Sequence, residues 1–137
     1  MTTTLYAGDQ ASQALGIQIE GAGEGRARLS MRVRADMLNG HGICHGGLIF
    51  TLADTAFAYA SNSRGPSVAA HCTISFLAPA QLDDVLTAIA DETTLEGGSG
   101  IYDVTVKNQT GVTLAVFRGV SKRLRPGVSL AAKAEAG

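Results

Sequence analysis

The chain has 137 residues, about the length of one domain. Hydrophobic residues make up 45% of the sequence and charged residues 17%, which excludes an intrinsically disordered composition and allows a buried core. A net charge of -1 argues against nucleic acid as the main partner, and two cysteines, Cys44 and Cys72, are too few for a secreted disulfide framework.

The sequence carries no recognisable signal for secretion or membrane insertion. Its start has neither the basic nor the apolar region of a signal peptide. The longest apolar stretch, residues 48–60, is interrupted by Asp54 and falls short of the roughly 20 residues that span a membrane. We therefore expect a cytoplasmic protein without a membrane segment.

The first third of the chain predicts a short helix, a hairpin and a loop. Apolar residues spaced along one face indicate a helix over residues 5–15 that ends at Gly16. Alternating apolar and charged residues over 17–34 predict a β-hairpin around the glycine-rich segment 21–25. The glycine-rich run of residues 39–47 predicts a loop, because glycine destabilises regular structure.

Residues 48–62 predict the one long helix of the chain. Alanine, leucine and phenylalanine dominate this segment, and no proline interrupts it. The helix is apolar on nearly every side, which is unusual for a helix at a protein surface. We therefore expect a sheet to wrap it and a second subunit to cover what the sheet leaves open.

The rest of the chain predicts strands. Four β-like runs, expected to form a meander, are separated by Gly, Asp and Asn and cover residues 68–77, 85–94, 101–108 and 112–124. The order of elements predicts an α+β fold, with the helix on one face of an antiparallel sheet, in a single domain over residues 1–126. Residues 127–137 lack a strand pattern and are expected to form a flexible tail.

Asp54 is the residue with the clearest chemical potential. It lies in the middle of the long helix among apolar neighbours, where lost hydration raises the pKa of a carboxyl group unless the group is paired or near solvent. One interpretation is a carboxylate that faces water or pairs with an arginine. The other is a general base or nucleophile in an apolar pocket.

The second feature is the entry to the long helix at His45-Gly46-Gly47. The first turn of a helix presents unpaired N–H groups, which can hold a phosphate or the oxyanion of an acyl-transfer intermediate; alternatively, the glycines only permit close packing. Asp54 follows His45 by nine residues, about 13 Å along a helix, so one chain cannot bring both groups to one carbonyl. A two-fold dimer with antiparallel helices side by side can.

Other chemistries have weaker support. His41, Cys44 and His45 are close in sequence, but a zinc site needs three or four ligands at suitable spacings, so we expect no metal. Adjacent Cys44 and His45 side chains rarely face each other, and no third group is evident to orient them as a nucleophile and base. His71 lies in a predicted core strand, and we expect it to be a buried structural histidine.

The loop and helix together resemble a known family. Residues 39–63, NGHGICHGGLIFTLADTAFAYASNS, are similar to the signature of PaaI-type hotdog-fold acyl-CoA thioesterases. The similarity continues through residues 73–80, 100–104 and 117–119, and covers about residues 12–125. The resemblance implies a hotdog fold, in which an antiparallel sheet of five to six strands wraps a long central helix, and an assembly of homodimers that form homotetramers.

The same resemblance implies an activity and a set of roles. The expected reaction is hydrolysis of an acyl-CoA, such as phenylacetyl-CoA or a hydroxylated aryl-acetyl-CoA, in phenylacetate degradation, without a cofactor. Asn39 would orient or polarise the substrate and the attacking water, and His45 would position the loop and contact the thioester. The Gly46 N–H would polarise the thioester carbonyl, and Asp54 of the opposite subunit would act as base or nucleophile. Further substrate contacts are expected at Gly47, Thr73, Phe57 and Tyr59.

Two parts of the expected site stay open. Many relatives carry a polar residue on the strand after the helix, close to the attacking water, and its counterpart could be Ala69, Ala70, His71 or Thr73. Charge alone makes five residues candidates for binding the phosphates of coenzyme A: Arg64, Arg118, Lys122, Arg123 and Arg125.

Two other functions are compatible with such a fold. One is a non-hydrolytic acyl-CoA-binding or regulatory protein, which would bind the thioester without releasing thiol. The other is a hydratase or dehydratase, but those enzymes pair an acid with a histidine on a differently patterned loop and helix, which this sequence lacks.

Overall fold

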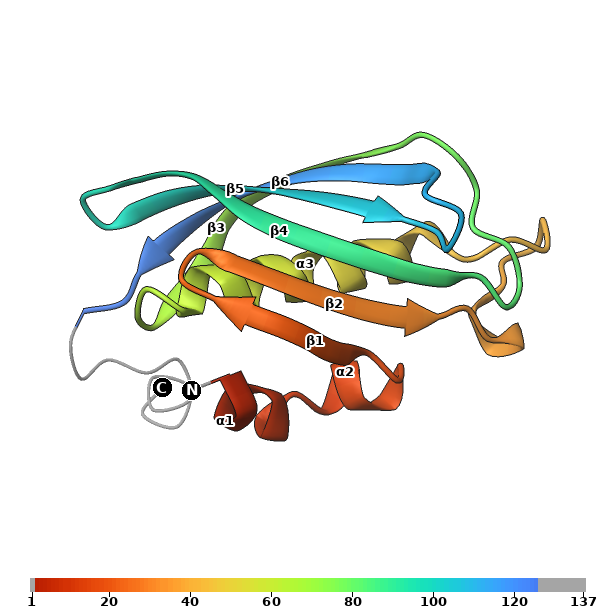
Figure 1. Cartoon of the computed structure of the whole chain (residues 1–137), viewed down its shortest axis with the longest axis horizontal. Helices are drawn as coiled ribbons and strands as arrows, with labels where there is room; N and C mark the ends of the chain where they lie inside the picture. Colours follow the sequence, from red (N-terminus) through yellow and green to blue (C-terminus); the bar gives the residue numbers. More distant parts are fainter. Residues whose placement is uncertain (1, 126–137) are drawn as a thin grey trace.

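The computed structural model describes residues 2–125 of the chain, as one long helix wrapped by a sheet, with two short helices outside it (Figure 1). The expected tail at residues 127–137 lies outside this range. In chain order the elements are α1 (Thr2–Gly8), α2 (Gln10–Ala14), β1 (Gln18–Gly23), β2 (Arg26–Arg32), the 3₁₀ helix η1 (Ala35–Met37), α3 (Gly46–Asn62), β3 (Ser67–Phe76), β4 (Val85–Glu96), β5 (Ser99–Lys107) and β6 (Thr113–Arg123).

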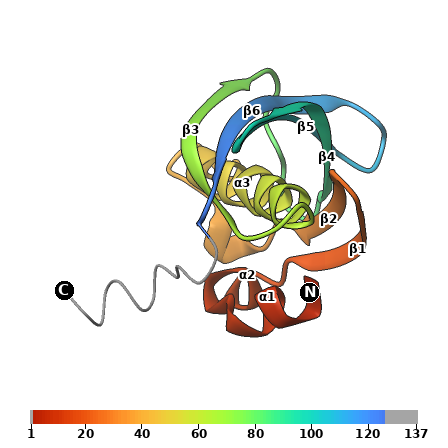
Figure 2. The same cartoon turned by 90° about the vertical axis from the view of Figure 1, so that its left-hand side faces the viewer.

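The six strands form one antiparallel sheet in the order β1-β2-β4-β5-β6-β3. A view along α3 shows the sheet curving around this helix from β3 to β1 (Figure 2). The α+β hotdog fold expected from the sequence is therefore confirmed.

The predicted meander of four strands is wrong for its first member. β3 pairs with β6 rather than with β4, so only β4, β5 and β6 form a meander. Alternating hydrophobicity determines which face of a strand is buried but not which strand lies beside it. β3 is consequently an edge strand, and His71 is exposed on it rather than buried as predicted.

The N-terminal segment forms two helices where the sequence predicted one. The chain breaks at Asp9, whose carboxylate caps α2 by accepting a hydrogen bond from the Ser12 N–H at 3.1 Å. α2 lies against α3 on the side that the sheet does not cover, and α1 packs beside α2 (Figure 2). None of the described helices has both the length and the hydropathy needed to cross a bilayer.

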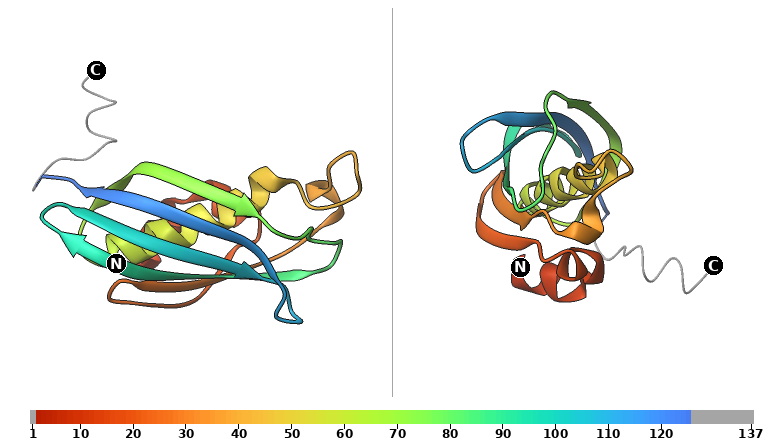
Figure 3. Two further views of the ribbon diagram at one scale, coloured as in Figure 1. Left: turned by 90° about the horizontal axis from the view of Figure 1, so that it is seen from above. Right: turned by 90° about the vertical axis from the view of Figure 1, so that its right-hand side faces the viewer.

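α3 supplies the centre of the hydrophobic core. Leu52, Ala53, Ala56 and Ala60 on this helix are fully buried under the sheet. Its N-terminus meets the long loop after β2 at one end of the molecule, and its C-terminus leads to β3 at the other (Figure 3). The two ends of the helix thus have separate surroundings.

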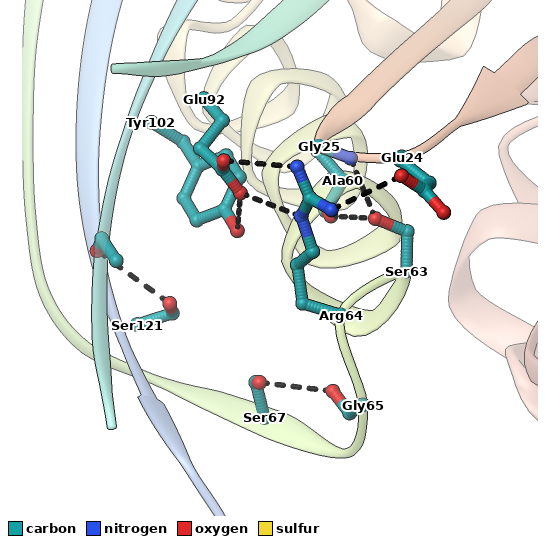
Figure 4. Close-up of polar contacts among 11 residues, drawn as sticks. Glu24, Gly25, Ala60, Ser63, Arg64, Gly65, Ser67, Glu92, Tyr102 and Ser121 are labelled. Atoms are coloured by element: carbon teal, nitrogen blue, oxygen red, sulfur yellow. Dashed lines mark hydrogen bonds and ion pairs between the residues drawn. The ribbon is translucent and has the colours of Figure 1, made fainter. Parts of the chain in front are cut away.

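The C-terminal end of α3 is tied to the sheet by Arg64 (Figure 4). The Arg64 guanidinium donates hydrogen bonds to both Glu92 carboxylate oxygens, at 3.0 and 3.1 Å, and a third to Glu24 at 3.3 Å. The Tyr102 hydroxyl donates to the same Glu92 carboxylate at 2.9 Å. The hydrogen bonds from Arg64 lower the pKa of Glu92, so this carboxyl group is ionised at neutral pH.

The Phe57 side chain of the helix packs directly against Gly119 of β6. A Cβ atom at this position would lie 2.7 Å from the Phe57 ring, which itself packs on Tyr102 and Phe117. Because Phe57 is enclosed, the added methyl group has no room unless the helix moves away from β6.

We therefore expect Gly119→Ala to destabilise the fold by about 1–3 kcal/mol, the usual cost of overpacking a core. Urea unfolding measures this change. Gly23→Ala is the matched control, because a Cβ at Gly23 meets no atom within 4 Å. Equal unfolding midpoints for the two variants would contradict the close packing of α3 on β6.

Candidate active site

Asn39 organises the loop that precedes α3. Its side-chain oxygen accepts hydrogen bonds from the backbone N–H groups of His41, at 2.9 Å, and Ile43, at 3.4 Å. The backbone closes the same loop through a 2.8 Å hydrogen bond from the Asn39 N–H to the Ile43 carbonyl. The oxygen of the amide is thus used within the loop, and among the described residues no hydrogen bond occupies its NH₂ group.

His45 is the N-cap of α3. Its Nδ1 accepts a hydrogen bond from the Gly47 N–H at 3.3 Å, so the neutral ring carries its proton on Nε2. The side chain is exposed, and Nε2–H can therefore donate to a bound molecule. This cap also explains why α3 begins at Gly46, two residues before the predicted start.

Gly46 occupies the first position of α3. At this position the backbone N–H has no acceptor within the helix. A Cβ at Gly46 would come within 3.2 Å of the Phe76 ring on β3, so glycine lets an aromatic side chain lie over the start of the helix. The Phe76 side chain is itself 52% exposed.

Two open grooves flank this helix start. One, of about 400 Å³, is mainly apolar and is lined by residues from the loop, α3 and the end of β3: Asn39, Ile43, Cys44, Gly46, Ile49, Phe76, Leu77, Ala78 and Pro79. The other, of about 370 Å³, is lined by Asp36, Met37, Leu38, His45, Gly47 and Leu48. The structure therefore brings Asn39 and Gly46 to one groove, and His45 and Gly47 to the other.

Asp54 lies on a different part of the same helix. It is half-buried, and no ion pair reaches it within residues 2–125. Burial raises the pKa of its carboxyl group, and the negative charge of Asp9 raises it further. Neither groove is lined by Asp54, and eight residues of helix place it roughly 12 Å along the axis from Gly46.

The other expected substrate-binding residues divide between the core and the surface. Phe57 and Tyr59 are only 1% and 3% exposed, so both belong to the hydrophobic core of this chain. Thr73 is exposed and pairs with Arg118 of β6. Because side chains alternate along a strand, Thr73 lies on the opposite face of β3 from the half-buried Cys72. Of these residues, only Gly47 borders a groove.

Sequence reasoning missed two residues near Asp54. Cys72 is half-buried on β3, and the Asp54 charge adds to burial in raising the pKa of its thiol. Cys72 is thus a residue of β3, the strand after the helix, that lies near enough to Asp54 to be affected by its charge. The alternating pattern of this strand could have placed Cys72 and Thr73 on opposite faces. The second missed residue is Asp9, whose charge raises the pKa of Asp54. No local signal in the sequence connects these two residues.

The cations proposed for coenzyme A differ in their availability. Arg64 is bound to Glu92 and Glu24, and Arg118 forms a bidentate pair with Asp103 at 2.8 and 2.9 Å. Within the described residues, no ion pair engages the remaining three: Lys122, Arg123 and Arg125.

Metal ligation has no geometric basis in the described part of the chain. No three His, Cys, Asp or Glu side chains between residues 2 and 125 gather closely enough to hold an ion. Cys44 is buried, and burial raises the pKa of its thiol, which disfavours the thiolate that a metal or a nucleophilic role requires.

Comparison with known proteins agrees with this architecture. The thioesterase superfamily model matches residues 41–115, which include most of the loop, α3 and the strands β3, β4 and β5. Acyl-coenzyme A thioesterase PaaI of Escherichia coli is 50% identical over 121 residues, covering 88% of this chain and 86% of that protein.

Solved structures show the same relationship. The structure described as the E. coli PaaI protein from the phenylacetic acid degradation operon matches with a TM-score of 0.88 and 48% identity over 90% of both chains. A Streptococcus mutans protein bound to acetyl CoA matches with a TM-score of 0.74 and 27% identity, over 79% of this chain and 91% of that chain. The chain therefore belongs to the thioesterase superfamily, as an acyl-CoA thioesterase of the PaaI type.

Proposed function

We propose that this protein hydrolyses aryl-acetyl-CoA thioesters, with phenylacetyl-CoA as the leading substrate, in an active site shared by two subunits. The observation that carries the proposal is the Asp54 carboxylate, half-buried without an ion pair in residues 2–125, on the helix whose first N–H, that of Gly46, has no acceptor within the helix. A base and an oxyanion-binding group are the two components that thioester hydrolysis needs.

The exposed flank of α3 supports a dimer. Gly47, Thr51, Asp54 and Ala58 are incompletely buried and recur at helical spacing, beside the half-buried Phe50. Apart from Phe50 these residues are small, so a second helix can approach closely. Within one chain, Gly46 and Asp54 are roughly 12 Å apart along α3. An antiparallel copy of α3 against this flank would instead place the partner's Gly46 close to Asp54.

The edge strand β3 supports the same assembly. It contributes ten residues at the border of the sheet, where backbone N–H and C=O groups on one side have no neighbouring strand. Pairing of two β3 strands would continue the sheet across a two-fold axis and place the two α3 helices side by side.

The reaction follows from this geometry. The thioester carbonyl accepts a hydrogen bond from the Gly46 N–H at the positive end of α3, and the His45 Nε2–H is available as a second donor. Asp54 of the other subunit takes a proton from water as the water oxygen bonds to the carbonyl carbon. The carbon–sulfur bond then breaks, and coenzyme A leaves as a thiolate that is protonated. Direct attack by Asp54 on the carbonyl carbon is the alternative, with water then hydrolysing the resulting anhydride.

The apolar groove supports an aromatic acyl group. Phe76 and Ile49 line it beside Gly46, so an aryl ring bound there would contact the Phe76 ring while its carbonyl reaches the helix N-terminus. The E. coli relative is described as a protein of the phenylacetic acid degradation operon, which supports phenylacetyl-CoA as the substrate.

The two free cysteines, Cys44 and Cys72, are compatible with the reducing environment of the cytoplasm, the location we propose for this protein.

We expect Asp54→Asn to lower turnover by several orders of magnitude while the protein remains folded, because the amide cannot accept the proton of water. Thiol release from acetyl-, long-chain acyl- and phenylacetyl-CoA measures the effect. The wild type should hydrolyse phenylacetyl-CoA with the highest kcat/KM. Near-normal hydrolysis by Asp54→Asn would refute the role of Asp54, and substrate protection in thermal unfolding without thiol release would favour the acyl-CoA-binding alternative.

The Gly46 N–H can be tested separately. Gly46→Pro removes this donor, and proline fits the first helical position, since His45 before it is already extended at φ -61° and ψ 130°. Gly46→Ala is the matched control, because it places a similar Cβ near Phe76 but keeps the N–H. We expect kcat to fall about 10²–10³-fold further in Gly46→Pro than in Gly46→Ala. Equal losses in both variants would show that crowding, not the donor, matters.

A further inference from the structure

The N-terminal helices hold a second carboxylate in a fixed position beside α3. Asp9 accepts hydrogen bonds from the Ser12 N–H at 3.1 Å and from the Ser12 hydroxyl at 2.6 Å. These contacts fix both carboxylate oxygens at the start of α2. No ion pair engages Asp9 within residues 2–125.

Ser12 connects this carboxylate to the middle of α3. The Ser12 side chain is 1% exposed, and its hydroxyl lies 3.4 Å from the hydroxyl of Thr55, the residue after Asp54. Thr55 in turn donates a 2.6 Å hydrogen bond to the Thr51 carbonyl within α3. The contact between α2 and α3 is therefore polar and buried, and it joins Asp9, through Ser12, to Thr55, the residue that follows Asp54.

Three further titratable groups lie near Asp9 or Asp54: Tyr6, Tyr59 and Cys72. Tyr6 of α1 donates its hydroxyl proton to the Ile17 carbonyl at 2.8 Å. Burial raises the pKa of Tyr59 to about 12, and its buried hydroxyl has no hydrogen-bond partner among the described residues. Burial also raises the pKa of Cys72 on β3. Among the described residues, Asp9 is the charged group that raises the pKa of Asp54.

We propose that Asp9 is a positioning residue for Asp54, whose negative charge, held by α2, keeps the Asp54 carboxylate a strong base for the attacking water. The proposal rests on the function proposed above. Like charges repel, so the Asp9 carboxylate favours the protonated form of Asp54. The Asp54 carboxylate therefore has a higher affinity for a proton. In agreement, the pKa of Asp54 is raised by Asp9 in addition to burial.

This arrangement couples the proposed chemistry to the N-terminal helices. Asp9 does not line either groove at the helix start, and its effect on Asp54 is electrostatic. Removal of its charge should therefore change how activity depends on pH more than it changes substrate affinity. Specifically, Asp54 should lose its proton at lower pH, so the acid side of the kcat/KM profile should move to lower pH while the plateau falls.

The test compares Asp9→Asn with wild type. Asparagine caps a helix as well as aspartate, so α2 should be retained, and Asp9→Ser is a second variant that also caps. The matched control is Asp91→Asn, which removes an exposed carboxylate paired with Arg26 on the outer side of the sheet. The carboxyl ¹³C signal of Asp54, identified by its loss in Asp54→Asn, is followed by NMR as pH changes.

We expect the titration midpoint of Asp54 to move to lower pH in Asp9→Asn and Asp9→Ser, and to stay in place in Asp91→Asn. An unmoved midpoint in both Asp9 variants, or an equal shift in the control, would overturn the proposal. The readout does not require turnover. A shifted midpoint in a protein that releases no thiol would refute the proposed function alone, whereas normal thiol release with an unmoved midpoint would refute the role of Asp9 alone.

Discussion

The burial of one carboxylate on an otherwise apolar helix is the constraint on which this structure depends. The sheet and the N-terminal helices enclose most of α3, and they leave a narrow flank on which Asp54 is only half-buried. Burial raises the pKa of a carboxyl group in that position. The groups that pack over the flank therefore determine how stable the Asp54 anion is. Its surroundings therefore serve both the fold and the proposed chemistry.

The two ends of α3 divide the work between structure and catalysis. At the C-terminal end, Arg64 and Glu92 join the helix to the sheet in a hydrogen-bonded pair, so the Arg64 cation is already engaged. At the N-terminal end, His45 caps the helix through one ring nitrogen only, and the N–H of Gly46 is left free. The fold thus satisfies its polar groups where it needs rigidity and leaves donors open where the proposed reaction needs them.

Much of this architecture could be predicted from patterns along the chain. The long helix, the hairpin and the positions of the later strands follow from local periodicity, and the motif from Asn39 to Asp54 indicated the family. Pairing of β3 with β6 could not be predicted, because alternation carries no information about a strand's neighbour, and the exposure of His71 follows from that pairing. Likewise, Asp9 reaches the surroundings of Asp54 only through the break between α1 and α2, a tertiary effect with no trace in the spacing of residues.

The shared site is tested most directly by mixing two inactive proteins, Gly46→Pro and Asp54→Asn, through joint refolding. In a two-fold dimer of the proposed kind, each mixed pair combines an intact Gly46 from one subunit with an intact Asp54 from the other in one of its two sites. We expect the mixture to release thiol from the substrate at a rate far above that of either variant alone. A mixture that forms mixed dimers by native mass spectrometry, yet remains as inactive as its components, would contradict a site built from two chains.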